Sequence, residues 1–274
     1  MIILILFILG LCFGSFVNAL VWRLRKQSTI KNKSTKNKYS ISTGRSMCIN
    51  CGHELAAKDL IPVVSWVILR GKCRYCRKPI SWQYPLVELA TALLFVALYV
   101  FWPDDLSSLA NKIDLATWTI ASIGLMALFV YDVRYMILPN KIIFPLTGLA
   151  VINVLAQAFI KTDYNVMLDS IFGVLAGGGL FYVLFQISNG AWIGGGDVKL
   201  GFLLGLLLAD PVLALLMLFL ASVLGSVFSL ILVVKKGAGI KTKIPFGPFL
   251  IVAAIITKLF GQNLIDWYNS LFIY

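Results

Sequence analysis

The chain of 274 residues contains a single histidine, His53, and only 12 acidic residues against 24 Lys and Arg. One histidine excludes a His-Glu-x-x-His metallopeptidase, which needs two, and argues against serine or cysteine hydrolases that use a histidine base. Charged residues make up only 13% of the chain, whereas 59% of it is hydrophobic. This scarcity of charge excludes a soluble domain with one core and predicts a polytopic membrane protein.

Apolar runs recur along the whole chain. Seven are long enough to cross a bilayer as helices, and an eighth is shorter. We therefore predict an all-α membrane bundle of about eight transmembrane helices. The eight runs cover residues 2–22, 84–101, 115–131, 141–160, 168–187, 198–209, 211–234 and 246–261.

The positive charge is concentrated in one loop. Residues 23–78 hold 14 basic residues and two acids, and their net charge of +12 equals that of the whole chain. Because an excess of Lys and Arg marks cytoplasmic loops, we expect this loop inside the cell and both termini outside. Charge confined to one juxtamembrane loop favours the lipid bilayer as its partner, and we expect no nucleic-acid partner.

We expect the first apolar run to be a transmembrane helix and not a secretory signal. A signal peptide carries its basic residues before the apolar region, whereas here Arg23, Arg25 and Lys26 follow it. We interpret residues 1–22 as a retained first transmembrane helix. Residues 23–83 are then a basic cytoplasmic loop, and residues 84–274 a seven-helix transmembrane domain.

The cytoplasmic loop contains two Cys-x-x-Cys pairs. Cys48 and Cys51 are separated by 21 residues from Cys73 and Cys76. This spacing is typical of four-thiolate zinc sites, in which each pair supplies two sulfurs. Cytoplasmic thiols stay reduced, which favours a metal over disulfides. We predict a structural Zn2+ site in a small zinc-ribbon-like insertion, because four thiolates leave no position for a reactive water.

A carboxylate follows three glycines directly before an apolar run. Asp197 comes after Gly194, Gly195 and Gly196. An ionisable group at membrane depth suggests function. Glycines lack a Cβ, so they allow another backbone to approach closely, and we expect these three to lie near a substrate chain.

A second carboxylate, Asp132, ends the third predicted span, where Leu138 and Pro139 stop the helix and Asn140 is a candidate cap for the next one. By alternation of the spans, Asp132 and Asp197 lie on the same side of the membrane. Two neighbouring carboxylates can share one proton, so that one activates water while the other donates a hydrogen bond to a carbonyl oxygen. We predict aspartyl peptidase chemistry, although the sequence does not show whether the two side chains meet.

Further polar residues lie in or near the first two spans. Glu88 is a third intramembrane carboxylate, for which pairing with a basic interfacial side chain is favoured over catalysis. Ser15 and Asn18 share a helix face, where they could join helices by hydrogen bonds or line a site.

Six short motifs follow one another along nearly the whole chain. They are Gly14-Ser15-Phe16 to Asn18, the two cysteine pairs, Ile80-Ser81, Tyr84-Pro85-Leu86-Val87-Glu88-Leu89, Asp132 with Leu138-Pro139, and Gly194-x-Gly196-Asp197-x-Lys199-Leu200. Together they resemble the type IV prepilin peptidase family, whose membrane aspartyl peptidases are of the GxGD type. Where the family usually has Gly-Met before Gly-x-Gly-Asp, this chain has Trp192-Ile193.

The resemblance implies an enzyme that removes the short basic leader from type IV prepilin, pseudopilin or competence pilin precursors at the cytoplasmic face of the cell membrane. It implies catalytic roles for Asp132 and Asp197 and metal-ligand roles for Cys48, Cys51 and the second cysteine pair. Many members also N-methylate the new terminal residue with S-adenosylmethionine, an activity that rests here on the resemblance alone.

Two other function classes stay open from the residues alone. A proton-coupled transporter would use Asp132, Asp197 and Glu88 as a relay, but would spread its acids across the membrane depth. A zinc-ribbon scaffold of a pilus or secretion assembly would not need the aspartates.

Overall fold

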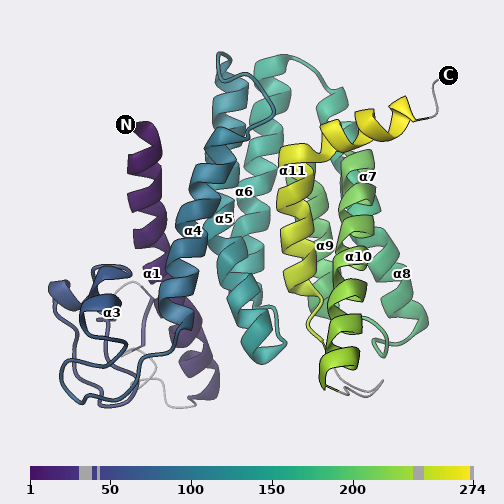
Figure 1. Cartoon of the computed structure of the whole chain (residues 1–274). Coiled ribbons are helices and arrows are strands. Elements are labelled where there is room, and N and C mark those ends of the chain that lie inside the picture. Colours follow the sequence, from purple (N-terminus) through teal and green to yellow (C-terminus); the bar gives the residue numbers. More distant parts are fainter. Residues whose placement is uncertain (31–38, 42–43, 237–243, 272–274) are drawn as a thin grey trace. The chain divides into compact units, whose positions relative to one another are not determined.

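The computed structural model describes residues 1–30, 39–41, 44–236 and 244–271. All regular elements in this part are helical, which confirms the predicted all-α class; only two isolated β-bridges join extended segments there. Figure 1 shows the elements α1 (Ile2–Thr29), η1 (Ala57–Asp59), α3 (Val64–Ile68), α4 (Gln83–Val100), α5 (Leu109–Tyr135), α6 (Asn140–Lys161), α7 (Asn165–Val174), η2 (Leu175–Gly179), α8 (Leu180–Ile187), α9 (Gly195–Leu208), α10 (Pro211–Lys236) and α11 (Gly247–Ser270).

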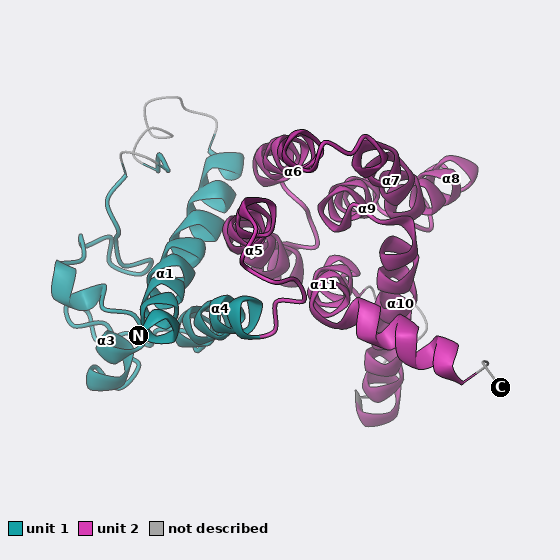
Figure 2. Cartoon of the chain, turned by 90° about the horizontal axis from the view of Figure 1, so that it is seen from above, with its two compact units in different colours: residues 1–100 teal, residues 101–274 magenta. Residues whose placement is uncertain are grey.

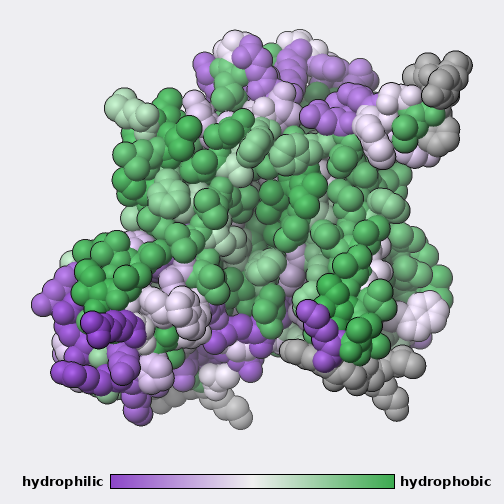
Figure 3. Space-filling view, in the orientation of Figure 1, coloured by the Kyte–Doolittle hydropathy of each residue, from purple (hydrophilic) through white to green (hydrophobic). Residues whose placement is uncertain are grey.

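Seven helical segments of the described chain are long and apolar enough to cross a membrane. Each corresponds to one of the predicted runs, and α7, η2 and α8 together make one of them, Asn165–Ile187. The eighth run is α9, whose 14 residues extend only about 21 Å, less than the apolar core of a bilayer. The helices are covered by apolar side chains along their middle parts (Figure 3). The chain is a multi-pass membrane protein.

The chain divides into two compact units, residues 1–100 and residues 101–274 (Figure 2). In the first unit α4 packs on α1. The three sequence segments expected above, 1–22, 23–83 and 84–274, stay a prediction.

Small residues set the distance between α1 and α4. A Cβ added to Gly10 would lie 2.5 Å from the Cα of Ala92, and one added to Gly14 would lie 2.6 Å from the Cα of Glu88. The contacting positions on α4 fall in residue number as those on α1 rise, so the two helices run antiparallel. Backbones approach this closely only where a side chain is missing, a common device in membrane helix pairs.

The part of the first unit between α1 and α4, residues 39–41 and 44–82, forms what we call the cysteine lobe. The buried Arg23 near the end of α1 holds the start of this lobe. Its guanidinium donates hydrogen bonds to three backbone carbonyls, those of Ser40, Ile41 and Gly44. Because a buried guanidinium needs several acceptors, this contact fixes the lobe to the end of the helix.

In the second unit, glycines of α7 and η2 pack on glycines of α9. A Cβ on Gly177 would lie 2.8 Å from the carbonyl oxygen of Gly201, and one on Gly201 would lie 2.5 Å from that of Gly177. Gly173 and Gly205 meet in the same way one turn further on. The η2 segment is π-helical, a local widening often found at functional sites. This contact positions α9, whose first turn carries Asp197.

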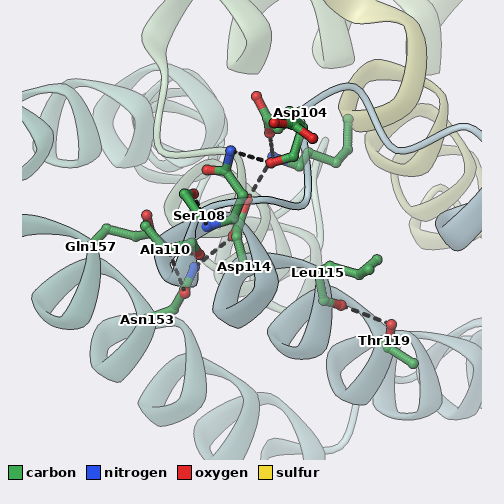
Figure 4. Close-up of polar contacts among 11 residues, drawn as sticks. Asp104, Ser108, Ala110, Asp114, Leu115, Thr119, Asn153 and Gln157 are labelled. Atoms are coloured by element: carbon green, nitrogen blue, oxygen red, sulfur yellow. Dashed lines mark hydrogen bonds and ion pairs between the residues drawn. The ribbon is translucent and has the colours of Figure 1, made fainter. Parts of the chain in front are cut away.

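A polar network joins α5, α6 and α11 near the start of α5 (Figure 4). The carboxylate of Asp114 accepts hydrogen bonds from Asn153 Nδ2 and Lys258 Nζ, both at 2.8 Å. Gln157 Nε2 donates to the carbonyl of Ala110 at 2.8 Å. Asp114 lies 18 residues, or about 27 Å of helix, from Asp132 on the same α5.

Candidate active site

Asp132 lies in the last turn of α5. The helix ends because Met136 adopts a left-handed conformation, with φ of 53°, and its N–H returns to the carbonyl of Asp132 at 2.8 Å. The Asp132 side chain points into the second unit and only 5% of the residue is exposed. The last turn of α5 thus places this carboxylate in a buried position.

Asp197 lies in the first turn of α9. Gly194 is the N-cap residue, and the N–H of Asp197 donates to its carbonyl at 3.0 Å. The Asp197 Oδ2 is turned back toward Gly194, where an added Cβ would lie 3.2 Å away. An acid in the first helical turn is favoured by the unpaired N–H groups there.

The structure brings these two acids together. The carboxylates of Asp132 and Asp197 lie within electrostatic range of each other. Leu138 lies between the two helix starts that carry and face the acids. A Cβ added to Gly196, the residue before Asp197, would lie 3.2 Å from Leu138 Cβ, and one added to Gly247, which faces Asp132, would lie 3.5 Å from Leu138 Cδ1. The sequence predicted two acids at one depth, and the structure adds that they are neighbours.

The start of α11 completes the site, and sequence reasoning missed it. A Cβ on Gly247 would lie 2.6 Å from Asp132 Oδ2, and the Gly247 N–H faces the same carboxylate. Among the described residues no group meets Oδ2 in good hydrogen-bond geometry, and this oxygen is buried. The available signal was Pro245-Phe246-Gly247-Pro248, a helix-start pattern directly before an apolar run.

A buried carboxylate oxygen without a partner is costly in a folded protein. Such a group is expected where a protein uses it on another molecule rather than for its own stability. Asp132 Oδ2 is one of several buried polar atoms in the described part of the chain without a well-aligned hydrogen bond, and it belongs to one of the two candidate acids.

The three predicted glycines differ in their surroundings. Gly194 lies at Asp197 and Gly196 at Leu138, whereas Gly195 is only in ordinary contact with Phe185. None of the three has a positive φ. An unusual backbone conformation therefore does not require glycine at these positions, and space is tight only at Gly194 and Gly196. The proximity of the three glycines to a substrate stays a prediction.

The expected cap role of Asn140 is wrong. Pro139 is the N-cap of α6 and has no side-chain cap bond, while Asn140 is already helical. The Asn140 Oδ1 instead accepts a hydrogen bond from Lys199 Nζ at 3.0 Å. This bond links the starts of α6 and α9 and holds the Lys199 ammonium at Asn140. Lys199 follows Asp197 by two residues, and side chains two apart on a helix do not face each other.

The first unit contains the cysteine cluster. The ligand atoms of Cys48, Cys51, Cys73 and Cys76 all lie within 4.8 Å of one another, and none of the four forms a disulfide. Burial alone would raise the pKa of Cys48, but the backbone N–H groups of Asn50 and Cys51 donate to its sulfur and the pKa is lowered to about 7. The cluster can hold a metal ion.

Side chains beside the cluster brace it. Asp59 accepts hydrogen bonds from Arg74 at 2.6 Å, from Tyr75 at 2.9 Å and from the N–H of Ala56. Burial would raise the pKa of Asp59, but these bonds outweigh it and lower that pKa. The His53 ring stacks on Tyr75 with centroids 3.7 Å apart, and its carbonyl accepts the N–H of Cys48.

Glu88 is buried in α4, but the expected pairing with a basic side chain is wrong. Its Oε2 accepts the backbone N–H of Val63 at 2.7 Å, and Ser15 also donates to it. Asn18 donates to the carbonyls of Gly14 and Tyr84. Ser15 and Asn18 therefore join elements of the first unit, one of the two roles left open above.

Paired carboxylates between helix ends in a membrane bundle are the arrangement expected of an intramembrane aspartyl peptidase. The chain belongs to the type IV leader peptidase family. The model of that family matches residues 119–230, and the bacterial peptidase A24 N-terminal domain matches residues 8–102.

Individual relatives extend over almost the whole chain. A prepilin leader peptidase/N-methyltransferase of Pseudomonas aeruginosa is 33% identical over 95% of this chain and 91% of its own length. One of Aeromonas hydrophila with the same name is 32% identical over 98% and 94%. A type 4 prepilin-like proteins leader peptide-processing enzyme of Escherichia coli O78:H11 is 35% identical over 90% of each. No solved structure matches this chain.

Proposed function

We propose that this protein is a membrane aspartyl endopeptidase that removes the leader from type IV prepilins or related pilin precursors. Membership of the leader peptidase family and the names of its relatives support the substrate class. The observation that carries the chemistry is the neighbouring pair of carboxylates, Asp132 and Asp197.

The two acids are proposed to act as a unit. Like charges a few ångströms apart cannot both ionise easily, so the pair holds one proton. The ionised carboxylate takes a proton from water as the water attacks the peptide carbonyl, and the protonated one donates a hydrogen bond to the developing oxyanion. When the tetrahedral intermediate collapses, the C–N bond breaks and the leaving amine takes a proton from the pair.

The site is proposed to open at the cytoplasmic face. The support is the charge of residues 23–78, since an excess of Lys and Arg marks the cytoplasmic side. Counting spans onward from this loop places Asp132, and then Asp197, on the same side of the membrane as the loop. Gly194, Gly195 and Gly196 are proposed to border the substrate backbone, because the absence of side chains at the start of α9 leaves room for an extended peptide.

The four cysteines are proposed to bind one structural zinc ion. Zinc with Zn–S bonds of about 2.3 Å in a tetrahedron requires sulfurs about 3.8 Å apart, and the Sγ atoms of Cys48 and Cys76 lie 3.9 Å apart. Four thiolates close the coordination sphere. A closed sphere leaves no position for a reactive water, so the role proposed for the ion is structural.

Methylation of the new N-terminus with S-adenosylmethionine is proposed on the names of the relatives alone. A cavity in the first unit, bordered by α1, α4 and the cysteine lobe, is lined by Asp59 and Glu88 among others. Both carboxylates are already hydrogen-bonded within the chain. The residues there do not mark a site for the methyl donor, and we assign none.

The test is co-expression with a tagged pilin precursor, followed by measurement of its mass. The wild type should remove the leader, whereas Asp132→Ala and Asp197→Ala should each leave the precursor uncut while accumulating normally in the membrane. Processing retained in either variant would exclude the paired mechanism.

A further inference from the structure

The short helix α3 presents an apolar surface that nothing within the described chain covers. Val64, Val67 and Ile68 lie on one face of this helix, and Ile61 precedes it. Val67 is 60% exposed and Ile68 70%, and the other two are also exposed. Figure 3 shows apolar side chains on the cysteine lobe where Figure 1 draws α3. We call Ile61, Val64, Val67 and Ile68 the α3 patch.

The position of α3 is fixed by two contacts with α4 and the residues just before it. On the inner side of the helix, Trp66 packs against Trp82 with the two rings tilted and their centroids 4.1 Å apart, and its indole N–H donates to the carbonyl of Ile80 at 3.2 Å. In the second contact, Glu88 accepts the N–H of Val63. The α3 helix therefore lies alongside the first turns of α4.

The neighbouring face of α4 is a lipid-facing stripe. Trp82, Leu86, Leu89 and Leu93 follow a helical spacing and are all exposed. An exposed apolar stripe on a membrane-spanning helix contacts lipid, and tryptophans at the ends of such helices lie at headgroup level. Trp82, which is 66% exposed, thus marks the headgroup level on α4.

Val63 contacts α4 deeper than this level. Glu88 lies six residues beyond Trp82, which corresponds to about 9 Å along the helix axis. Interfacial helices bury their apolar faces about 5–10 Å into the boundary between headgroups and acyl chains. The Glu88 Cα lies within this range, and the start of α3 is bonded to the end of its side chain, which leans back toward the start of α4.

The backbone at the entry to α3 is strained. Val63 has φ of 60°, a conformation unusual for a β-branched residue that persists only where the surroundings hold it. Its N–H is the group bonded to Glu88. The turn directs the chain toward α4 at the depth where the patch begins.

From these contacts we infer that the α3 patch is inserted into the interfacial layer of the bilayer and anchors the cysteine lobe to the lipid. Trp66, on the same short helix as the patch, contacts Trp82 at the end of the lipid-facing stripe of α4. Lys72, which follows it and is exposed, supplies positive charge for anionic headgroups. Glu88 acts as a positioning residue, because it holds the entry of α3 against α4.

Photo-crosslinking tests this inference on the full chain. A benzophenone amino acid is placed at Val67, at Ile68, or at the exposed Arg45 of the same lobe as a control, and each protein is irradiated in vesicles of phosphatidylethanolamine and phosphatidylglycerol. We expect lipid-sized mass additions at Val67 and Ile68, several-fold above those at Arg45. Equal metal content of the three proteins establishes that the lobe is folded.

Two results would overturn the inference. Crosslinks from Val67 and Ile68 to a second copy of the chain would identify the patch as a protein interface. Lipid additions no greater than those at Arg45 would show that α3 lies outside the bilayer. Because no peptidase activity is measured, the outcome is independent of the proposed cleavage reaction.

Discussion

Gly247→Ala should inactivate the peptidase without unfolding it. The added Cβ would lie 2.6 Å from Asp132 Oδ2, whereas ordinary contact begins at 3.4 Å, so the carboxylate or α11 must move by roughly 0.8 Å. A displacement of about 1 Å in a catalytic constellation can cost on the order of 10²-fold in rate. This corresponds to about 2.7 kcal/mol of transition-state stabilisation.

The measurement is the rate of leader removal from a purified pilin precursor in detergent, with Gly148→Ala as matched control. Gly148 is also helical and in the second unit, but a Cβ there would meet nothing within 4 Å. The control should cleave at the wild-type rate, because alanine is a better helix former than glycine. Equal rates for Gly247→Ala and Gly148→Ala would refute the proposed arrangement of α11 against Asp132.

Three further predictions concern the rest of the molecule. Metal analysis should find about one zinc ion per chain and none in a Cys48→Ala, Cys73→Ala double variant; unchanged metal content would contradict a thiolate site. Gly201→Leu should lower cleavage and thermal stability together, because its side chain would enter the backbone of Gly177; wild-type behaviour in both assays would show that η2 and α9 are not in this contact. Lys258→Met leaves the largely buried Asp114 without its cation and should lower stability by about 1–3 kcal/mol, visible as a lower melting temperature in detergent; an unchanged melting temperature would contradict a stabilising role for the pair.

The helical fold could be predicted because its signals are long and local. Apolar runs of about 20 residues specify membrane helices, and all seven long runs occur as helices in the structure. The cysteine cluster could be predicted for the same reason, because each Cys-x-x-Cys pair is a local pattern whose two sulfurs can bind one metal ion.

The parts that could not be predicted depend on packing between distant segments. The contact of Gly247 with Asp132 joins residues more than 100 positions apart, and no local pattern encodes it. Glu88 was expected to pair with a basic side chain, because charge is visible in a sequence. Its actual partner is the N–H of Val63. The sequence does not show that an unusual turn at Val63 makes this backbone group available.

The central claim is that Asp132 and Asp197 form one catalytic unit. The most direct test compares cleavage rates of Asp132→Asn, Asp197→Asn and the double variant, because residues that act as a unit show strongly non-additive losses. We predict that each single variant loses as much activity as the double variant, with all three proteins folded and inserted in the membrane. A single variant that retains substantial cleavage, or losses that simply add, would contradict the paired mechanism.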